Sequence, residues 1–285
     1  MKRKLLVVLL ILFSLNSIAQ EIQDETNMIF INKNPKELYL GAILKISSLD
    51  KDKYEIVEGS NLPQVTYLMI NKDVPPMTPN LSSMRDFIRK EIKGEDLSTI
   101  VSTGYPKLQK VESYEKLGAV FGERINPEIM LAVNPKSKKS KSVYVATFTN
   151  MIYTINCQTD IVKAKAHPAL KGLDPKDLMY VEQLSFGRFA TIFIESDAAY
   201  EKIEALVQKK YEKKALSDQE ESIIANSTIH FQILDYNETG LATGDPFDVI
   251  REYISAPITE NDFLRPIWTS GINLNDIKKI LKQNV

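Results

Sequence analysis

The residues that most often perform chemistry in proteins are sparse in this sequence. It contains one cysteine, Cys157, and two histidines, His167 and His230, which lie far apart along the chain. A single thiol excludes an internal disulfide, and these three side chains are too few for a cysteine- or histidine-rich metal site. Cys157 ends an alternating apolar run, so we expect it to be a half-buried small hydrophobic residue.

Motifs that position catalytic or phosphate-binding groups are also missing from the sequence. It has no G-x-S-x-G turn to carry a nucleophilic serine, no P-loop and no G-x-G-x-x-G fingerprint. No set of catalytic groups converges in the sequence. We therefore expect a protein that is not an enzyme and that uses no cofactor or metal.

The first nineteen residues predict a secretory signal peptide. A basic start (2–4) precedes an apolar run (5–15), and Ser17 and Ala19 supply the small residues that signal peptidase requires. The apolar run is too short to span a bilayer comfortably as a helix, which makes an uncleaved anchor the weaker alternative. We expect the protein to be secreted, with a mature chain of residues 20–285.

The charge of the mature chain restricts its partners. Residues 1–19 hold three basic and no acidic groups, so their removal changes the formal net charge from −1 to −4. This mild acidity argues against a nucleic-acid partner and provides no long-range attraction to anionic lipid. No other segment is long and apolar enough to predict a transmembrane helix.

Alternating and β-branched runs predict a sheet with two unusually long strands. The long runs are 142–157 and 179–195, and shorter ones cover 66–71, 106–113 and 228–235. Run 179–195 places apolar side chains on one face and polar ones on the other. Because typical strands have five or six residues, the long runs indicate a tall, twisted antiparallel sheet.

Helices are expected between and after these strands. An apolar stripe begins after Ser83 and is closed by Gly94, while Asp245 caps a second helix that ends near residue 254. Asn273 can cap a last helix over 274–281. The fold class is therefore α+β.

Two connections between the strands carry patterns that suit more than one structure. Segment 1 (112–141) supports a helical period in its first half, and it also supports a strand period that is interrupted by Glu123 and Pro127. A transmembrane β-hairpin needs two strands of about ten residues and a turn, which this segment can supply. An ordinary helix–loop–strand connection is the alternative. The strand face consists of Leu117, Ala119, Phe121, Ile125, Ile129, Leu131 and Val133.

Segment 2 (198–227) alternates only loosely. Lys209 and Lys213 interrupt the alternating face, and a lysine at the middle of a bilayer costs about 2–4 kcal/mol. Ile203, Leu206 and Val207 instead follow an amphipathic helix, so the residues alone favour a structural helix here. The alternating set consists of Ala205, Val207, Tyr211, Ala215, Ile223 and Ala225.

Five short stretches carry a resemblance to a known family. They are LYLGAIL (38–44), TNMIYTI (149–155), VEQLSFGR (181–188), NSTIHF (226–231) and PIWTS (266–270). In this order and at this spacing they resemble the thiol-activated (cholesterol-dependent) cytolysins, and together they cover nearly all of the mature chain. The residues that carry the resemblance most clearly are Tyr39, Gly41, Tyr153, Phe186, Gly187, Arg188, Pro266 and Trp268.

The resemblance implies an elongated, membrane-attack-complex-like core. Its bent, twisted antiparallel sheet (106–235) is flanked by two helical clusters, 112–141 and 205–227, that unfold into membrane hairpins. Residues 20–105 and 236–285 are then supporting segments. The implied function is that of a pore-forming protein that oligomerises and inserts a β-barrel into a target membrane.

Departures from the family pattern limit what the resemblance implies. The chain stops soon after Trp268, where the family begins a C-terminal β-sandwich with a tryptophan-rich, cysteine-containing loop. We therefore expect neither that sandwich nor its recognition of cholesterol, and targeting would fall to membrane lipid, a surface receptor or a longer homologue. Asp235 and Tyr236 stand where the family has paired glycines. A secreted, non-lytic binding or scaffolding protein on the same fold is the alternative.

Overall fold

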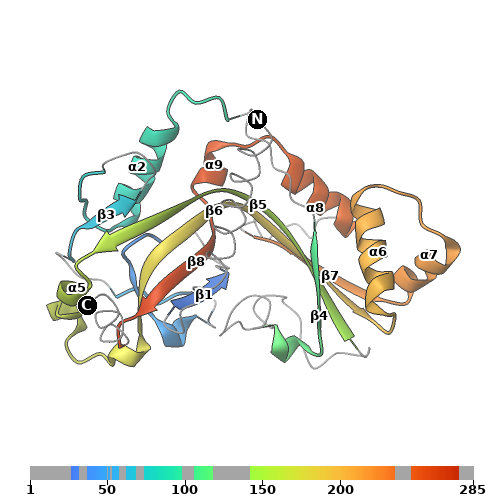
Figure 1. The fold of residues 1–285 in the computed structure, drawn as a ribbon, viewed down its shortest axis with the longest axis horizontal. Helices are drawn as coiled ribbons and strands as arrows, with labels where there is room; N and C mark the ends of the chain where they lie inside the picture. The colour runs from blue at the N-terminus through green and yellow to red at the C-terminus, as the bar shows by residue number, and fades with distance from the viewer. Residues whose placement is uncertain are drawn as a thin grey trace, which may run out of the picture.

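Two strands far longer than their neighbours run through the centre of the fold. β5 (Ser142–Thr159) and β6 (Leu178–Ser196) are antiparallel and pair along nearly their whole length. Within the described residues the chain is α+β, and Figure 1 shows an elongated molecule arched along its sheet. The structure, a computed structural model, describes residues 27–31, 37–49, 51, 53–57, 62–68, 74–97, 106–117, 142–234 and 245–275.

Shorter strands widen the sheet at the end where β5 finishes and β6 begins. β3 (Val65–Leu68) lies beside β5, while β2 (Ile43–Lys45) and β8 (Pro266–Asn273) lie beside β6. β1 (Asn27–Ile31) pairs with β8 and completes this half of the sheet.

At the other end only two further strands are present among the described residues. β4 (Lys107–Val111) lies beside β5, and β7 (Thr228–Ile233) lies beside β6. The order there is β4-β5-β6-β7, and every pairing in the eight-stranded sheet is antiparallel.

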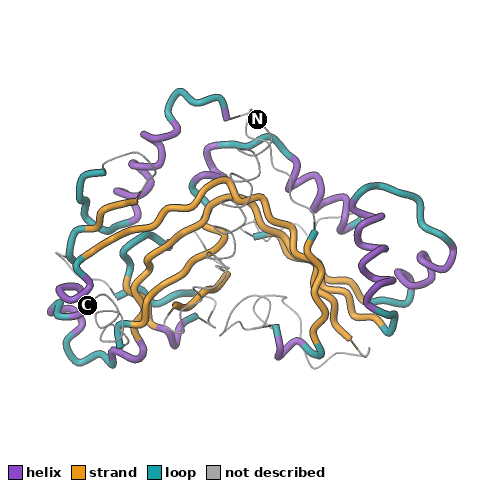
Figure 2. Tube along the Cα trace, viewed as in Figure 1, coloured by secondary structure: helices purple, strands orange, loops and turns teal. Residues whose placement is uncertain are grey.

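Both long strands bend near the middle of their length, as Figure 2 shows. At this level the β5–β6 register shifts between Met151 and Tyr153, opposite Gly187. Gly187 has a φ of +149°, and a Cβ atom there would lie 1.9 Å from the carbonyl oxygen of Asn150. The close approach of the two backbones therefore requires glycine, and the bulge beside it bends the strands.

Helices cover the outer side of the arch. α2 (Leu81–Ile92), α9 (Glu260–Phe263), α8 (Pro246–Ser255) and α6 (Tyr200–Tyr211) follow one another along this side (Figure 1). The short helix α7 (Asp218–Ala225) lies beyond α6. Helix α5 (Ile161–Lys165) and two 3₁₀ turns, Pro168–Leu170 and Pro175–Asp177, connect β5 to β6, and further 3₁₀ turns are at Ile46–Ser48 and Tyr114–Lys116.

The sheet is buried on both faces in its β4–β7 half. One face, which we call the α6 face, packs side chains such as Phe148, Ile192 and Ile194 against α6 and α8. The opposite face, which we call the Tyr114 face, packs Val143 and Phe193 against the turn at Tyr114. Alternation along each strand assigns successive residues to opposite faces.

Most of the predicted elements are confirmed. The long runs are β5 and β6, the shorter ones correspond to β3, β4 and β7, and Asp245 caps α8. Helix α2 begins after Asn80 rather than Ser83, because the Asn80 side chain accepts the capping hydrogen bond from the Ser83 amide. The helix predicted over 274–281 lies largely outside the described residues.

Two expectations about burial are wrong. The second face of β6 is not an exposed polar face, because Phe189 and Phe193 pack there in a core of their own. Cys157 is fully buried rather than half-buried, and burial raises the pKa of its thiol to about 12. The first difference arises because the β4–β7 half of the sheet is covered on both sides, and the second because Cys157 belongs to the main apolar core.

Candidate functional site: two segments at one end of the sheet

Segments 1 and 2 leave the sheet at the same end and from neighbouring pairs of strands. Val111, the last residue of β4, lies opposite Val143 of β5, so segment 1 connects two strands that are already paired. Glu195 lies opposite Thr228, so segment 2 connects β6 to β7 in the same way. Ser142 pairs with Ser196, which places both connections at one level.

Segment 2 is helical in this structure. In α6, Ile203, Leu206 and Val207 are buried and pack on the α6 face of the sheet. In α7 no side chain is fully buried, and its start is held by a capping box between Ser217 and Glu220. The prediction that segment 2 forms helices is therefore confirmed for 200–211 and 218–225.

Ion pairs attach the two helices to their surroundings. Lys210 pairs with Asp245 at the start of α8, and Arg251 of α8 donates hydrogen bonds to the carbonyl oxygens of Lys210 (3.3 Å) and Tyr211 (3.2 Å). Lys209 of α6 contacts both carboxylate oxygens of Glu220 in α7, at 2.8 and 2.9 Å. The hydrogen bonds from Lys209, and then those from Ser217, lower the pKa of Glu220 to about 2.

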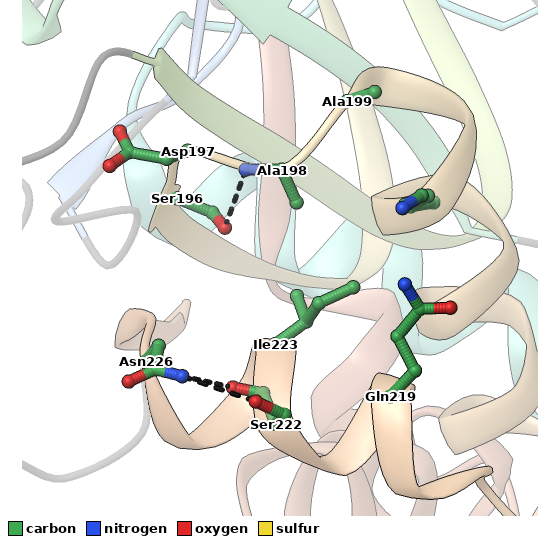
Figure 3. Close-up of a pocket in the computed structure, with 9 residues that line it drawn as sticks. Ser196, Asp197, Ala198, Ala199, Gln219, Ser222, Ile223 and Asn226 are labelled. Carbon is green, nitrogen blue, oxygen red and sulfur yellow. Dashed lines mark hydrogen bonds between the residues drawn. The ribbon is translucent and has the colours of Figure 1, made fainter.

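A cavity of about 390 Å³ separates α7 from the end of β6 and the start of α6 (Figure 3). Helix α7 contributes only the half-buried Ile223 and Ile224 to the core on the α6 face, whereas α6 contributes three fully buried side chains. The residues that line the cavity include Ser196, Lys202, Gln219, Ser222, Ile223 and Asn226.

The first residues of segment 1 lie on the opposite face of the sheet. Tyr114 and Leu117 are buried among Val111, Val143 and other apolar residues of the Tyr114 face. The Tyr114 hydroxyl donates a hydrogen bond of 2.5 Å to Oε1 of Glu195, which is itself buried. Burial, followed by this carboxylate, raises the pKa of Tyr114. The bond joins the start of segment 1 to the strand that leads into segment 2.

Replacing Tyr114 by phenylalanine is expected to lower the free energy of unfolding by about 1–3 kcal/mol, because the buried hydrogen bond to the Glu195 carboxylate is lost. Urea unfolding followed by circular dichroism measures the change. The control is Tyr200→Phe, whose hydroxyl contacts the Leu108 carbonyl oxygen at 3.1 Å and the exposed Glu204. We expect its effect to be within about 0.5 kcal/mol, and equal effects would contradict the special role of Tyr114.

The predicted membrane-facing residues are placed differently in the two segments. In segment 2, Val207 is buried, Tyr211 and Ile223 are half-buried, and the three alanines are exposed. In segment 1, Leu117 is buried. The remaining predicted residues of segment 1 lie outside the described residues, and they are Ala119, Phe121, Ile125, Ile129, Leu131 and Val133.

The motif residues taken from the resemblance occupy the middle of the sheet. Tyr153 stacks on Phe186, with ring centroids 4.7 Å apart, and its hydroxyl donates to the Phe263 carbonyl oxygen at 2.7 Å. Pro266 pairs with Phe186, and Trp268 lies edge-on to Phe189 at 5.8 Å. These contacts pack the middle of the sheet against α9 and β8.

Two further motif residues lie near the start of the described chain. Tyr39 is half-buried against the main core, while Gly41 has a φ of +82°. A Cβ atom on Gly41 would lie 2.7 Å from Cγ1 of Val65. Gly41 also hydrogen-bonds through its amide to the Val181 carbonyl oxygen of β6 at 2.9 Å.

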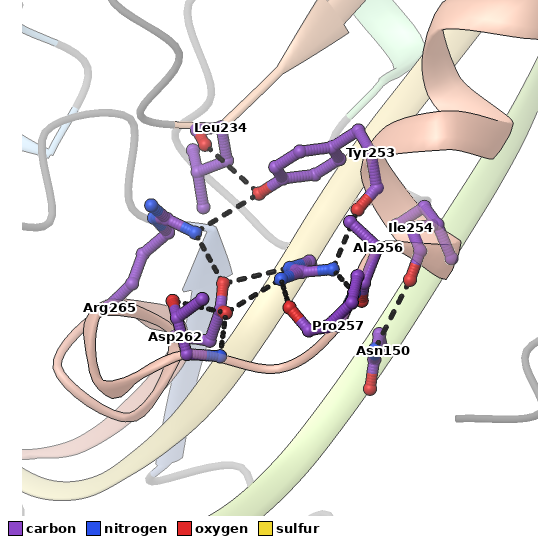
Figure 4. A network of polar contacts seen from close by, with 10 residues as sticks. Asn150, Leu234, Tyr253, Ile254, Ala256, Pro257, Asp262 and Arg265 are labelled. Carbon is purple, nitrogen blue, oxygen red and sulfur yellow. Dashed lines mark hydrogen bonds and ion pairs between the residues drawn. The ribbon is translucent and has the colours of Figure 1, made fainter. Parts of the chain in front are cut away.

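Arg188, next to the bend, uses every donor of its guanidinium group. Figure 4 labels its partners Tyr253, Ala256, Pro257 and Asp262. Nε and Nη2 bind the two carboxylate oxygens of Asp262 at 2.8 and 2.7 Å. The remaining donors bind the carbonyl oxygens of Tyr253 (2.9 Å), Ala256 (2.6 Å) and Pro257 (2.7 Å). Arg188 therefore joins the centre of the sheet to the end of α8 and to α9, and we call this network the Arg188 clamp.

Asp262 is the partner that sequence reasoning missed. It also accepts hydrogen bonds from Arg265 and from the amide and hydroxyl of Thr259. Burial disfavours its charged form, but the hydrogen bonds from Arg188 and Thr259 outweigh that effect and lower its pKa. The spacing of Thr259 and Asp262 is that of a capping box, which was the available sequence signal.

The described residues offer little else for a functional site. They contain no group of three or more histidine, cysteine, aspartate or glutamate side chains that could hold a metal ion. None of their helices is both long and apolar enough to cross a bilayer.

The sequence matches no family model and no curated protein. The fold does match solved structures. One structure of pneumolysin aligns with a TM-score of 0.59 at 16% identity, covering 87% of this chain and 60% of that one. A disulfide-locked mutant of intermedilysin with human CD59 aligns at 0.56 and 17%, covering 88% and 58%.

Listeriolysin O gives the same result, with a TM-score of 0.57 at 17% identity, covering 88% of this chain and 58% of that one. The chain thus spans about 60% of the length of the structures it matches. Over almost all of its length, the chain has the fold of the cholesterol-dependent cytolysins pneumolysin, intermedilysin and listeriolysin O.

Proposed function

We propose that this chain is a secreted pore-forming protein whose copies associate and insert segments 1 and 2 into a target membrane as β-hairpins. The observation that carries the proposal is the geometry where the segments leave the sheet. Each segment connects two strands that are already antiparallel partners at their last pair, Val111 with Val143 and Glu195 with Thr228. Extending either segment would lengthen an existing hairpin without changing the order of strands.

The lengths of the segments and the needs of a bilayer support the proposal. Two strands of about ten residues and a turn require about 25 residues, and both connections are longer than this. An open sheet edge in lipid leaves backbone groups unpaired, so insertion requires several copies that close a barrel. In the described residues β4 pairs only with β5, and β7 only with β6, which makes these two strands the natural contacts between copies.

Targeting is the part of the proposal that depends on a partner. Intermedilysin has been solved with human CD59, which makes a surface protein one candidate partner for this chain. A longer homologue that carries its own membrane-binding unit is another, and membrane lipid alone is a third. Cholesterol is not proposed, because the described residues contain one buried thiol and one tryptophan, both in core strands.

A non-lytic binding or scaffolding function is the second candidate. It is favoured by the charge of segment 2, where ion pairs between Lys209 and Glu220 and between Lys210 and Asp245 hold α6 and α7 in place. Such contacts are typical of helices that stay folded. The two candidates differ in one property, which is whether α6 has to leave the sheet for activity.

A reversible crosslink between α6 and α8 tests this property. Cysteines replacing Lys210 and Asp245, whose side chains are in contact, would be joined by a thiol-specific crosslinker that a reductant cleaves. Cys157 is buried and the pKa of its thiol is raised to about 12, so it does not react. We expect dye release from vesicles and bacterial cells, tested with and without companion secreted proteins, to be abolished by the crosslink and restored by the reductant.

The matched control joins α2 to α9 with the same reagent. Cysteines replacing Arg89 and Glu260, whose side chains lie 2.8 Å apart, form a crosslink that involves neither segment. We expect this control to release dye at the rate of the uncrosslinked protein. Dye release that persists with α6 crosslinked, or no release and no ring-shaped oligomer under any condition, would contradict the proposed function.

A further inference from the structure

Helix α7 is polar on the side that it turns toward the rest of the protein. Gln219, Ser222, Ile223 and Asn226 line the cavity behind the helix, and their spacing places them on one side of it. The inward side of a surface helix normally carries apolar residues, as the buried side of α6 does. Here three of the four residues have hydrogen-bonding side chains, and they face an open space rather than a core.

The opposite wall of the cavity leaves room for a ligand. It runs from Ser196 at the end of β6 through Ala198 and Ala199 to Lys202 in the first turn of α6. The two alanines extend little into the space, and Figure 3 shows the Gln219 side chain pointing across the gap toward this wall. The cavity volume, about 390 Å³, falls within the range of about 300–1,000 Å³ that is typical of small-molecule sites.

Polar groups on both walls have hydrogen-bonding capacity left over. The side chains of Lys202 and Gln219 form no hydrogen bond or ion pair with any residue that the structure describes. Asn226 donates through Nδ2 to the Ser222 carbonyl oxygen at 2.8 Å, which orients its amide and leaves Oδ1 as an acceptor. The buried Ser196 hydroxyl accepts a backbone amide at 3.2 Å and keeps its own hydrogen to donate.

The charges around the cavity restrict the kind of ligand. Asp218, Glu220 and Glu221 of α7 do not line it, and the carboxylate of Asp197, which does, points away from the gap in Figure 3. A hard divalent cation would require several such oxygens. The described lining residues also include no aromatic ring on which a flat ligand could stack. A metal ion and an aromatic ligand therefore do not fit.

A neutral ligand rich in hydroxyl groups fits the cavity best. Carboxamide and serine side chains both donate and accept, so each can pair with either end of a sugar hydroxyl. Ile223 and the two alanines of the opposite wall add a small apolar surface for the C–H side of a sugar ring. Gln219 and Asn226 are exposed, which lets a ligand enter from solvent.

We propose that the cavity between α7, the end of β6 and the start of α6 binds a mono- or disaccharide, whose hydroxyl groups contact Gln219, Asn226 and Lys202. The ligand binds only while α7 is in place, so opening of α7 becomes rarer by the factor 1 + [L]/Kd. Binding does not depend on pore formation. Slower release of segment 2, the consequence for activity, does rest on the proposed function.

Titration with free sugars tests the site without a membrane. The probes are glucose, galactose, mannose, N-acetylglucosamine, maltose and lactose, with inorganic phosphate and sulfate in parallel. We expect at least one sugar to slow hydrogen exchange in residues 218–225 saturably, by about tenfold at ten times its Kd. Exchange in α2, which is far from the cavity in Figure 1, should not change.

Two variants test the assignment of the contacts. Gln219→Leu and Lys202→Met each replace a polar group of the cavity by an apolar side chain of similar length, and each is expected to weaken sugar binding by roughly tenfold. The control is Gln208→Leu, the same change at an exposed residue of α6 that does not line the cavity. It should bind as the unchanged protein does, and circular dichroism confirms that all three variants are folded.

The outcomes separate this inference from the proposed function. Binding of no sugar, or of phosphate or sulfate alone, overturns the inference, and so does sugar binding that the two cavity variants leave unchanged. If a sugar binds at the cavity but does not slow dye release, the site stands and its control of segment 2 is wrong. If no condition gives dye release, the pore-forming function fails while the measured binding remains.

Discussion

Replacing Arg188 by methionine is expected to lower the free energy of unfolding by about 3–5 kcal/mol. The change leaves Asp262 charged, 2% exposed and without the guanidinium that binds both of its oxygens. It also removes the donors to three carbonyl oxygens at the end of α8. Because these contacts join the sheet to both α8 and α9, the loss should appear as a lower midpoint in urea, measured by circular dichroism.

The double variant Arg188→Met with Asp262→Leu is the control for this interpretation. If the loss arises from an uncompensated buried charge, removing that charge should restore part of the stability. If instead the double variant loses as much stability as the Arg188→Met and Asp262→Leu variants together, each side chain acts through its own packing. Arg265→Met, which removes a partly exposed partner of Asp262 at 2.9 Å, should have a smaller effect than Arg188→Met.

The contribution of Asp262 and Arg188 to the free energy of unfolding is expected to decrease in acid. The pKa of Asp262 is lowered in the folded protein, so its stabilising effect is complete above the ordinary value of 3.8 and decreases as the pH falls below that value. The difference in stability between the unchanged protein and the Asp262→Leu, Arg188→Met pair should therefore shrink in acid.

Replacing Gly187 by alanine is expected to lower the free energy of unfolding by more than about 3 kcal/mol. The new Cβ atom would lie 1.9 Å from the carbonyl oxygen of Asn150, which belongs to the backbone of β5 and cannot move aside as a side chain would. Either the strands separate at the bend or the chain does not fold. Yield of folded protein and thermal unfolding measure the effect.

Gly172→Ala is the matched control. Gly172 also has a positive φ, +87°, but nothing lies within 4 Å of the position of its Cβ atom. Alanine at this position is disfavoured only because its backbone rarely adopts a positive φ, at a cost of about 1–2 kcal/mol. Equal destabilisation by the two variants would show that the close approach of β5 and β6 at Gly187 does not matter.

The strands were predictable because their signal is local. β5 and β6 are long runs of alternating apolar residues, which is a pattern typical of strands. The start of α8 is identified by two adjacent residues, Asp245 as the cap and Pro246 in the first turn. The burial of both faces of β6 was not predictable, since it depends on which elements pack on the second face.

The Arg188 clamp and the register of β6 and β7 show why the rest could not be predicted. Arg188 and Asp262 are 74 positions apart in the sequence, and nothing local to either residue identifies the other. The composition of the two strands likewise does not reveal whether Glu195 lies opposite Thr228 or one residue further on. A shift of one residue would move every side chain of β7 to the other face of the sheet.

The gap behind α7 gives segment 2 a direction of unravelling. Detaching residues 218–225 uncovers no fully buried side chain and only the half-buried Ile223 and Ile224, whereas detaching 200–211 uncovers Ile203, Leu206 and Val207 together. If segment 2 is released as proposed, α7 is therefore the part that detaches at lower cost, and α6 the part that stays docked longer. Release of the segment would then proceed backward along the chain, from the β7 side toward β6.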